Sequence, residues 1–386
     1  MSAHALLSPS GASRWLSCPP SARLEAKYPN SESEAAAEGT LAHSLGELHL
    51  LRYLSAIDKK DFEKIHDQIK ASKFYNESMV DYVDSYVAYA VETYEAAKAA
   101  DPTTVMSVEL KLNLTAYVPE AFGTGDVVIA SEGTLHIIDL KYGKGVRVEC
   151  KGNKQMRLYA LGALGDYDYL YPIDQVVMHV FQPRMDNIDT DTISVTDLRA
   201  WAEKVLVPTA RLAFDGKGEF SPGDHCRFCR AKAQCKALAE ENLKLAAYDF
   251  KEGFLLEDEE ISDILNRAAA FTNWLTSVQE FALSAAINEG KKWPGYKLVE
   301  GRSNRVYSDP TAVMQKLETS GFKESMYLVK KLAGITDLEK NMGKTIFSNV
   351  LGELIIKPAG KPTLVSEADK RPEWSSESSA INDFKD

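Results

Sequence analysis

The feature that most constrains the fold of this chain is a change of hydrophobic periodicity near residue 105. Before it, leucines and tyrosines recur at helical spacing and predict helices over about 34–55 and 60–99. After it, apolar and polar residues alternate, which predicts four strands, at 105–112, 126–130, 135–141 and 175–181. A chain that changes period in this way is expected to pack helices against a sheet.

The connections between these segments indicate how the sheet is built. Residues 131–134 have the composition of a hairpin turn, and a helix over about 153–164, ended by Gly165, separates the third and fourth strands. The strand–helix–strand crossover implies a mixed sheet flanked by helices, which is an α/β fold. We also expect a short N-terminal helix at 8–18 and a helix at 196–214 that begins at Thr196.

The last third of the chain has a different pattern. It predicts a long amphipathic helix at 257–289, a strand pair near 296–299 and 305–307, and short helices from Pro310 and Thr336. The sequence from Thr336 to Glu339 fits a capping box. We therefore expect a first domain over 1–240, with a helical insertion at about 55–100. A mostly helical α+β accessory domain would follow over 241–386, with a polar tail from about 372.

The net charge of −11 argues against a protein that coats nucleic acid through bulk electrostatics. A local basic strip nevertheless follows the third strand, and its candidate DNA-binding residues are Lys144, Arg147, Lys151, Lys154 and Arg157. No apolar run is long enough to span a membrane, and the N-terminus does not have the pattern of a signal peptide. We therefore expect a cytoplasmic protein with no membrane partner.

The third predicted strand ends in an acid and a lysine that share one face. Asp139 and Lys141 are two residues apart, and residues at that spacing in a strand point to the same side. Asp126 opens the preceding strand, and a hairpin would bring it close to Asp139. Two neighbouring carboxylates favour a hard cation such as Mg²⁺ or Mn²⁺ between them. Such an ion can polarise a phosphate, and a nearby ammonium can stabilise the charge that develops.

Further polar residues are expected near this pair. His43 lies on a helix ahead of the strands, where its imidazole could complete a metal site. Gln155 and Tyr159 are four residues apart on the helix after Lys141, so they share one helical face. Glu109, on the first strand, is an accessory candidate, and a solvent-facing strand residue is an equal alternative.

These residues occur in the order of a known set of motifs. The set comprises His43, Gly123-Thr124-Gly125-Asp126, Asp139-Leu140-Lys141 and Gln155-Met156-Arg157-Leu158-Tyr159. It resembles the RecB-like branch of the PD-(D/E)XK nucleases, whose sheet is of the restriction-endonuclease type. The resemblance implies that His43, Asp126, Asp139 and the Leu140 carbonyl hold the metal. It also implies that Lys141 orients or activates water, and that Gln155 and Tyr159 contact DNA or support the metal site.

The cysteines are unevenly distributed along the chain. Cys226, Cys229 and Cys235 lie within ten residues, Cys18 lies far upstream and Cys150 stands apart. The odd count in a chain expected to be cytosolic argues against a disulfide framework. Cysteines at this spacing suit a Zn²⁺ ion, with His225 or Cys18 as the fourth ligand, or an iron–sulfur cluster, and buried thiols without a metal are a third reading.

Within the RecB-like nucleases, a group that includes the AddB nuclease domain and the CRISPR-adaptation nucleases has one cysteine before the nuclease motifs and three after them. This chain resembles that group, with Cys18 before His43 and the other three after Tyr159. The resemblance implies a 4Fe-4S cluster held by Cys18, Cys226, Cys229 and Cys235. It leaves Cys150 as an ordinary residue.

The segments 293–305 and 360–365 resemble an uncharacterised phage and prophage family. That resemblance suggests a DNA exonuclease of phage replication or recombination in the cytoplasm of a bacterial host. Its partners would be double- or single-stranded DNA and a phage single-strand-binding or recombination protein. Arg302, Arg305, Lys357 and Lys361 are candidates for a DNA path. The alternative function is a catalytically inactive iron–sulfur protein that binds DNA or serves as an adaptor.

Overall fold

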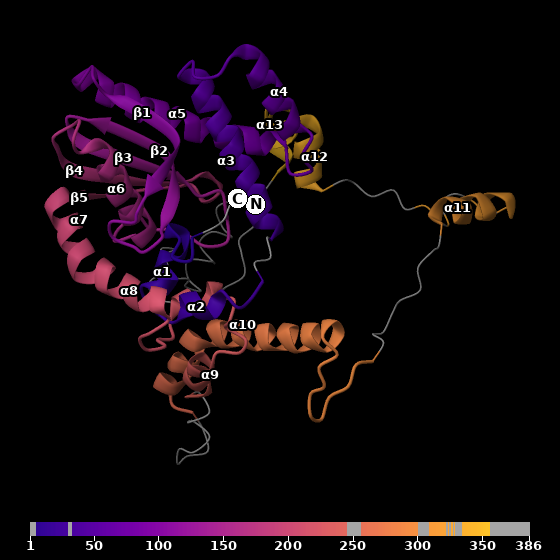
Figure 1. Ribbon diagram of the computed structural model, residues 1–386. Coiled ribbons are helices and arrows are strands. Elements are labelled where there is room, and N and C mark those ends of the chain that lie inside the picture. Colours follow the sequence, from indigo (N-terminus) through magenta and orange to yellow (C-terminus); the bar gives the residue numbers. More distant parts are fainter. Residues whose placement is uncertain are drawn as a thin grey trace. The chain divides into compact units, whose positions relative to one another are not determined.

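The structure is a computed structural model, shown in Figure 1. It describes residues 5–29, 33–244, 256–299, 309–321 and 334–355, together with Lys323, Met326 and Leu328. The chain divides into two compact units, residues 1–285 and 286–386. The domain boundary that the sequence suggests near residue 240 remains a prediction. No helix in the described part of the chain is long and apolar enough to cross a membrane.

The first unit contains a five-stranded mixed sheet with the order β1-β2-β3-β4-β5. Its strands are β1 (Val105–Asn113), β2 (Phe122–Ser131), β3 (Gly133–Leu140), β4 (Ile173–Gln182) and β5 (Asn187–Ser194). Only β3 and β4 are parallel, and the other three neighbouring pairs are antiparallel. The mixed α/β architecture that the alternating pattern predicts is therefore confirmed.

Helices cover both faces of this sheet (Figure 1). One face packs against α3 (Glu34–Tyr53), α4 (Lys59–Lys70) and α5 (Glu77–Ala100). The other face packs against α6 (Lys154–Tyr167), which connects β3 to β4, and against α7 (Val195–Trp201) and α8 (Val207–Asp215). Successive side chains of a strand point to opposite faces of the sheet, so each strand contributes to both hydrophobic cores. In β3, Ile137 packs on the side of α6 and Ile138 on the side of α5.

Several local predictions are confirmed and others are wrong. The hairpin at 131–134 is present, and Gly133 adopts a left-handed φ of 79° in its turn. The single helix expected over 60–99 is instead two helices, because the Asn76 side chain accepts a hydrogen bond from Met79 N and starts α5 afresh. The helix α6 continues past Gly165 to Tyr167.

Around β5 the structure differs from the sequence-based expectations in one strand and one helix cap. Strand β5 was not predicted because it is an edge strand in which Asp189 and Asp191 interrupt the apolar alternation. The cap of α7 is Ser194, whose side chain accepts from Asp197 N, and not Thr196. A π-helical turn, Ala202–Leu206, joins α7 to α8.

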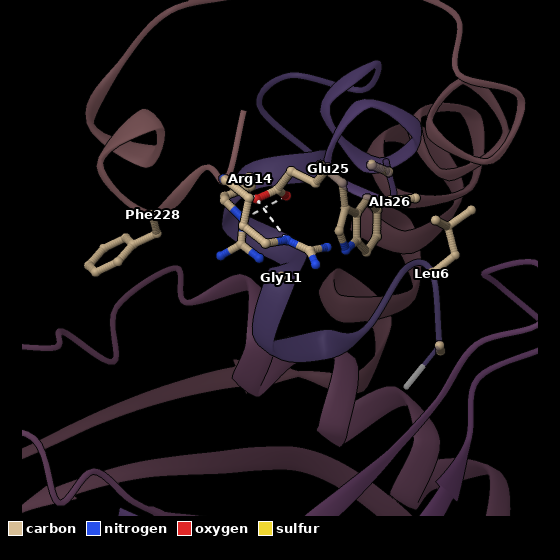
Figure 2. A pocket seen from close by; sticks show the side chains of 10 residues that line it. Leu6, Gly11, Arg14, Glu25, Ala26 and Phe228 are labelled. Carbon is tan, nitrogen blue, oxygen red and sulfur yellow. Dashed lines mark hydrogen bonds and ion pairs between the residues drawn. The ribbon is translucent and has the colours of Figure 1, made fainter. Parts of the chain in front are cut away.

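The N-terminal segment consists of a 3-10 turn, η1 (Pro9–Gly11), and two short helices, α1 (Ala12–Trp15) and α2 (Ser21–Glu25). Buried Glu25 ties it to a segment more than 200 residues away. Its carboxylate accepts hydrogen bonds from Arg14 Nε at 3.0 Å and from the backbone N of Arg230 at 2.8 Å (Figure 2). The N-terminal segment and the segment around Arg230 therefore meet at Glu25.

The described helices after residue 244 are α10 (Asp258–Asn288), α11 (Pro310–Thr319), α12 (Ile335–Met342) and α13 (Lys344–Leu351). The long helix and the helix from Pro310 are confirmed. The capping box at Thr336 is wrong, since α12 begins at Ile335 after Gly334. Residues 296–299 form no strand. The expected strand at 305–307, the polar tail, and Arg302, Arg305, Lys357 and Lys361 lie outside the described residues.

Candidate metal centre

The two aspartates of the predicted site meet at one end of the hairpin formed by β2 and β3. Val127 pairs with Ile138, so Asp126 and Asp139 are the next cross-strand neighbours. Leu140 N donates a hydrogen bond of 2.7 Å to Asp126 Oδ2, which fixes that carboxylate against β3. The expectation that the hairpin brings the two acids close together is confirmed.

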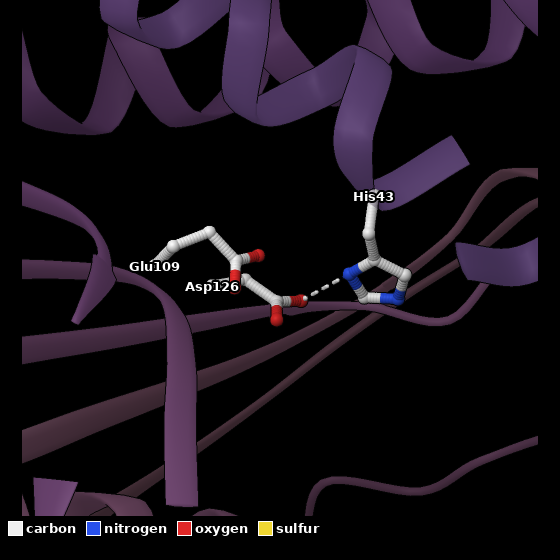
Figure 3. A group of neighbouring side chains, drawn as sticks. All are labelled: His43, Glu109 and Asp126. Atoms are coloured by element: carbon white, nitrogen blue, oxygen red, sulfur yellow. Dashed lines mark ion pairs between the residues drawn. The ribbon is translucent and has the colours of Figure 1, made fainter. Parts of the chain in front are cut away.

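His43 reaches this end of the sheet from α3. Its Nδ1 lies 3.3 Å from Asp126 Oδ2, and Figure 3 shows the imidazole hanging from the helix toward the carboxylate. Burial disfavours the charged imidazole, but Asp126, with a smaller contribution from Asp139, outweighs that cost and raises the pKa of His43 to about 9. In the absence of a cation, His43 therefore carries the positive charge that compensates Asp126.

Glu109 is the third donor of this group and adopts an unusual backbone conformation. In the register of β1 and β2 it lies opposite Asp126, where the regular pairing is interrupted, and its φ is +49°. Ligand atoms of His43, Glu109 and Asp126 all lie within 4.8 Å of one another (Figure 3). Burial, followed by the charge of Asp126, raises the pKa of Glu109 to about 7. A left-handed φ in a non-glycine strand residue is strained, and such strain is concentrated at functional sites.

Lys141 and Gln155 hold the second aspartate. Lys141 Nζ lies 2.9 Å from Asp139 Oδ2 and donates to Gln155 Oε1, also at 2.9 Å. Gln155 Nε2 in turn donates to Tyr159 Oη at 2.8 Å and to Asp139 Oδ1 at 3.4 Å. The helix α6 starts at the Asn153 cap, and its first turns place Gln155 and Tyr159 over the strand end. Asp139, Lys141, Gln155 and Tyr159 are thus joined by hydrogen bonds and an ion pair. Asp139 is not part of the group formed by the donor atoms of His43, Glu109 and Asp126.

The two aspartates differ in their electrostatics. Burial opposes ionisation of Asp126, but the charge and hydrogen bond of His43 and the Leu140 amide together lower its pKa. Burial raises the pKa of Asp139 against the opposing charge of Lys141, and neighbouring Asp126 raises it further. Asp139 is only 2% exposed, and its Oδ2 makes the ion pair with Lys141 but no regular hydrogen bond.

These donors fit a hard divalent cation. Buried carboxylate oxygens are normally hydrogen-bonded, so Asp139 Oδ2 retains capacity for a further partner. Carboxylates and an imidazole are ligands that Mg²⁺ and Mn²⁺ accept. The predicted ligand role of the Leu140 carbonyl remains a prediction, since the contact in the structure is made by its amide.

The five basic candidates divide into two groups. Lys144, Arg147 and Lys151 are exposed. By contrast, Lys154 donates to Ser17 Oγ at 2.7 Å, and the guanidinium of Arg157 stacks 5.2 Å from the Trp201 ring centroid. The exposed residues are therefore the ones free to meet a phosphate backbone.

The loop that carries the exposed basic residues is anchored by a residue that the sequence analysis missed. Gln182 is 1% exposed, accepts from Val148 N at 3.1 Å and donates to the carbonyls of Gly143 and Val146 at 2.8 Å. A glutamine at the end of an apolar strand is a weak sequence signal. Its role as an anchor of the loop becomes visible only when the structure shows that its side chain is buried against the loop backbone.

The cysteines of the predicted cluster come from two distant segments of the first unit, the N-terminal segment and residues 226–235. Cys18 follows α1, Cys226 lies in the turn η4 (Asp224–Phe228), and Cys235 precedes α9 (Lys236–Leu243). Burial raises the pKa of Cys226, and Cys18 and Cys235 are close enough to raise it further. Burial raises the pKa of Cys229 to about 12, with smaller contributions from Glu25, Cys226 and Cys235.

Two further observations describe this cysteine group. Among the described residues, the trio of His43, Glu109 and Asp126 is the only set whose donor atoms all lie within 4.8 Å, so no three of these sulfurs do. His225 Nε2 lies 3.8 Å from Cys226 Sγ. Cys150 lies apart from the group, with its Sγ 3.1 Å from Met178 O.

The model of the family described as "Protein of unknown function (DUF2800)" matches residues 4–372. The chain belongs to this family. The match extends over both units of this DUF2800 protein, and only residues 1–3 of the first unit and 373–386 of the second lie outside it.

A solved structure titled "Crystal structure of SSO0001" is similar over 50% of the DUF2800 chain and 81% of its own length, at 12% identity and a TM-score of 0.23. At that TM-score the likeness carries no argument about fold or function.

Proposed function

We propose that this protein is a metal-dependent DNA nuclease of the RecB-like PD-(D/E)XK type, which hydrolyses phosphodiester bonds and acts from DNA ends. The observation that carries the proposal is the joining of Asp126, Asp139 and Lys141 at one strand end. A structural pair of surface charges would not need a buried aspartate beside a second carboxylate, nor a strained glutamate next to them.

The proposed cofactor is Mg²⁺ or Mn²⁺, held by His43, Asp126 and Asp139, with Glu109 as an additional ligand. The ion would polarise the phosphate and lower the pKa of water. Support comes from His43, Glu109 and Asp126, whose donor atoms all lie within 4.8 Å of one another. Asp139 is the cross-strand neighbour of Asp126 in the same hairpin.

The chain's own residues would act on the phosphate and on water. An ammonium group has three donors, and Lys141 uses two of them on Asp139 and Gln155. The third is available to orient the attacking water or to stabilise charge on a phosphate oxygen as the P–O bond to the leaving group breaks. Gln155 and Tyr159 keep Lys141 and Asp139 in place, which makes them positioning residues.

We further propose a 4Fe-4S cluster held by Cys18, Cys226, Cys229 and Cys235. Four thiolates around one zinc at about 2.3 Å would bring the sulfur atoms within roughly 4 Å of one another. No three of the described sulfurs lie within 4.8 Å of one another, and the choice of an iron–sulfur cluster rests on the resemblance of the cysteine order to that of iron–sulfur nucleases. The cluster would link the N-terminal segment to residues 226–235.

The proposed substrate is double- or single-stranded DNA in a bacterial cytoplasm, including phage DNA during replication or recombination. A phage single-strand-binding or recombination protein is the proposed partner. The exposed residues Lys144, Arg147 and Lys151 support an electrostatic contact with the DNA backbone close to the metal centre.

A cleavage assay tests the proposal. Wild-type protein and a Lys141→Ala variant are incubated with Mg²⁺ or Mn²⁺ and with linear, circular, single-stranded and double-stranded DNA. We expect wild type to degrade linear DNA and to leave covalently closed circles intact, and Lys141→Ala to be inactive.

The matched control is Asp174→Asn, an exposed acid at the start of β4, at the opposite end of the parallel pair from Asp139. Its cleavage rate should equal that of wild type. Wild-type protein that cuts none of the four substrates with either cation would overturn the nuclease proposal, and cleavage of closed circles would overturn the exonuclease assignment.

A further inference from the structure

A second candidate site lies between the N-terminal segment and the segment that carries Cys226, Cys229 and Cys235. It is a cavity of about 590 Å³, whose main lining residues are Leu6, Arg14, Trp15, Glu25, Phe228 and Arg230. Cavities that bind small molecules or parts of larger ligands measure roughly 300–1,000 Å³. The cavity therefore has room for one nucleotide.

The polar lining carries an excess of positive charge. Glu25 is flanked by Arg14, whose Nε donates to it at 3.0 Å, and by Arg230, whose Nε lies 3.9 Å away. Within the described residues, the two terminal nitrogens of Arg14 make no hydrogen bond, and Arg230 uses only Nη1, on Tyr28 O. One carboxylate is thus shared by two guanidinium groups that still have donors available, which suits an anion with several oxygens.

The remaining lining is apolar and aromatic. Phe228 is 57% exposed, although large aromatic side chains are usually covered. Figure 2 shows Phe228 and Leu6 at opposite ends of the cavity, with Arg14 and Glu25 between them. An exposed ring beside free guanidinium groups is the combination that binds a base and its phosphate.

The segment that supplies Phe228 is locally basic. Between Cys226 and Lys236 the sequence contains Arg227, Arg230, Lys232 and Lys236 and no acid, in a chain of net charge −11. Arg227 lies 5.8 Å from the Phe228 ring centroid, so positive charge also borders the stacking surface. This local excess favours phosphate-bearing ligands over neutral ones.

The 3-10 turn η1 lines the cavity at one end and contacts strand β2 at the other. Gly11 lines the cavity, whereas Pro9, at the start of that turn, lies against Gly123 of β2. A Cβ added at Gly123 would lie 2.8 Å from Pro9 Cγ and 3.2 Å from Tyr159 Cε1, so the turn is seated directly on the strand that leads to Asp126.

We propose that this cavity binds the terminal nucleotide of a DNA strand, with its phosphate on Arg14 and Arg230 and its base on Phe228. Seating the strand end in the cavity would present a nearby phosphodiester to Asp126, Asp139 and Lys141. The inference deepens the proposed nuclease function and rests on it for the role of the strand end. The same nucleotide chemistry could come from a free mononucleotide product.

Binding is measured without divalent cations, so that the result does not depend on cleavage. The ligands are thymidine monophosphate, thymidine, inorganic phosphate and a short fluorescent oligothymidylate, titrated by calorimetry or fluorescence anisotropy. We expect the monophosphate to bind about tenfold more tightly than thymidine or phosphate alone and to compete with the oligonucleotide. Phe228→Ala and Arg230→Gln should each weaken monophosphate and oligonucleotide binding by about tenfold.

The matched controls are Phe220→Ala and Arg211→Gln, which replace exposed residues outside the cavity lining and should bind as wild type does. Thermal unfolding shows whether each variant is folded. We expect Phe228→Ala to fold as wild type does, because the Phe228 side chain is largely exposed. Equal binding by wild type, Phe228→Ala and Arg230→Gln would overturn the proposal. Weakened monophosphate binding with unchanged oligonucleotide binding would overturn the strand-end assignment.

The two proposals can fail separately. Tight, variant-sensitive nucleotide binding by a protein that cuts no DNA would refute the nuclease proposal alone. Cleavage that proceeds with no effect of either cavity substitution on binding would refute the cavity proposal alone.

Discussion

Strand β3 contributes to two groups of buried ionisable side chains that differ in how they are satisfied. Near its middle, His136 Nδ1 lies 3.0 Å from His179 Nε2, and His179 Nδ1 lies 2.8 Å from the Tyr89 hydroxyl. At its end, Asp139 faces Asp126 and Lys141. The first group can be neutral throughout, since a hydrogen-bonded chain from Tyr89 to His136 leaves no charge on it. The second group contains the ion pairs of His43 with Asp126 and of Lys141 with Asp139.

The pKa values express the same contrast. Burial, followed by the proximity of His136, lowers the pKa of His179 to about 4, so this ring stays neutral at physiological pH. In the acidic centre, the pKa of His43 is raised to about 9, and Asp139 Oδ2 has no regular hydrogen bond. A buried polar group that is neutral and hydrogen-bonded stabilises one fold, whereas one that is charged and incompletely satisfied is suited to a ligand.

The largest expected effect is on the rate of DNA cleavage and comes from a substitution in the group of Asp126, Asp139 and Lys141. Asp139→Asn should lower the rate of DNA cleavage by about a thousandfold or more, because it would remove a ligand of the proposed cation. The free energy of unfolding should stay equal or rise, since a buried carboxyl with a raised pKa is replaced by a neutral amide. Cleavage rates and urea unfolding curves measure both. Parallel losses of activity and stability would show that Asp139 is structural.

The cysteine group provides a third set of buried ionisable residues to compare. Cys229→Ser should lose bound iron and sulfide, and the free energy of unfolding should fall by about 3 kcal/mol or more, because a bound inorganic group contributes to folding. Cys150→Ala is the matched control, a buried cysteine outside the group that should keep its iron. Elemental analysis of anaerobically purified protein decides the metal, and stoichiometric zinc without iron would contradict the cluster.

For the histidine pair, we expect stability to depend on pH through His179 and cleavage to be unaffected. The unfolded state binds a proton at His179 below about pH 6.5, whereas the folded state binds it only below about 4. Stability is therefore fully present above pH 6.5 and should fall by roughly 2–3 kcal/mol as the pH drops to 4. His179→Gln should remove this part of the slope and leave cleavage at neutral pH unchanged. An unchanged slope in unfolding curves would refute the assignment.

The smallest expected effect is a difference in stability between two variants of Glu109, which separates backbone strain from the metal-binding role of the carboxylate. Glycine tolerates a φ of +49°, whereas alanine does not. Glu109→Gly should therefore be more stable than Glu109→Ala by about 1 kcal/mol. Both variants should bind Mn²⁺ more weakly than wild type, and to the same extent, because both lack the carboxylate. Calorimetric titration and thermal unfolding measure the two effects, and equal stability of the two variants would exclude backbone strain at this position.

Much of the acidic centre was predictable because its members carry strong local signals. Asp139 and Lys141 share a face at the end of an apolar strand, and Gln155 and Tyr159 share a face on the next helix. These periodicities are properties of the local chain, so they can be read without knowing the fold. The π-helical turn and strand β5 were missed because their residues have no such period.

Other features depended on contacts between distant segments. Nothing in the sequence around Glu109 predicts its left-handed backbone, which places it opposite Asp126. The same holds for Gln182, whose side chain bonds a loop more than 30 residues away, and for Glu25, which holds Arg230.

Local patterns are enough to predict four of the five strands, the order of the motifs and the residue types that can hold a cation, because periodicity and ligand chemistry are local. The packing of distant segments sets which of these groups are charged, and it brings the turn that lines the basic, aromatic cavity against strand β2. Desolvation and ion pairing depend on what surrounds a side chain in space, and for this chain the surrounding residues come from segments far apart in the sequence.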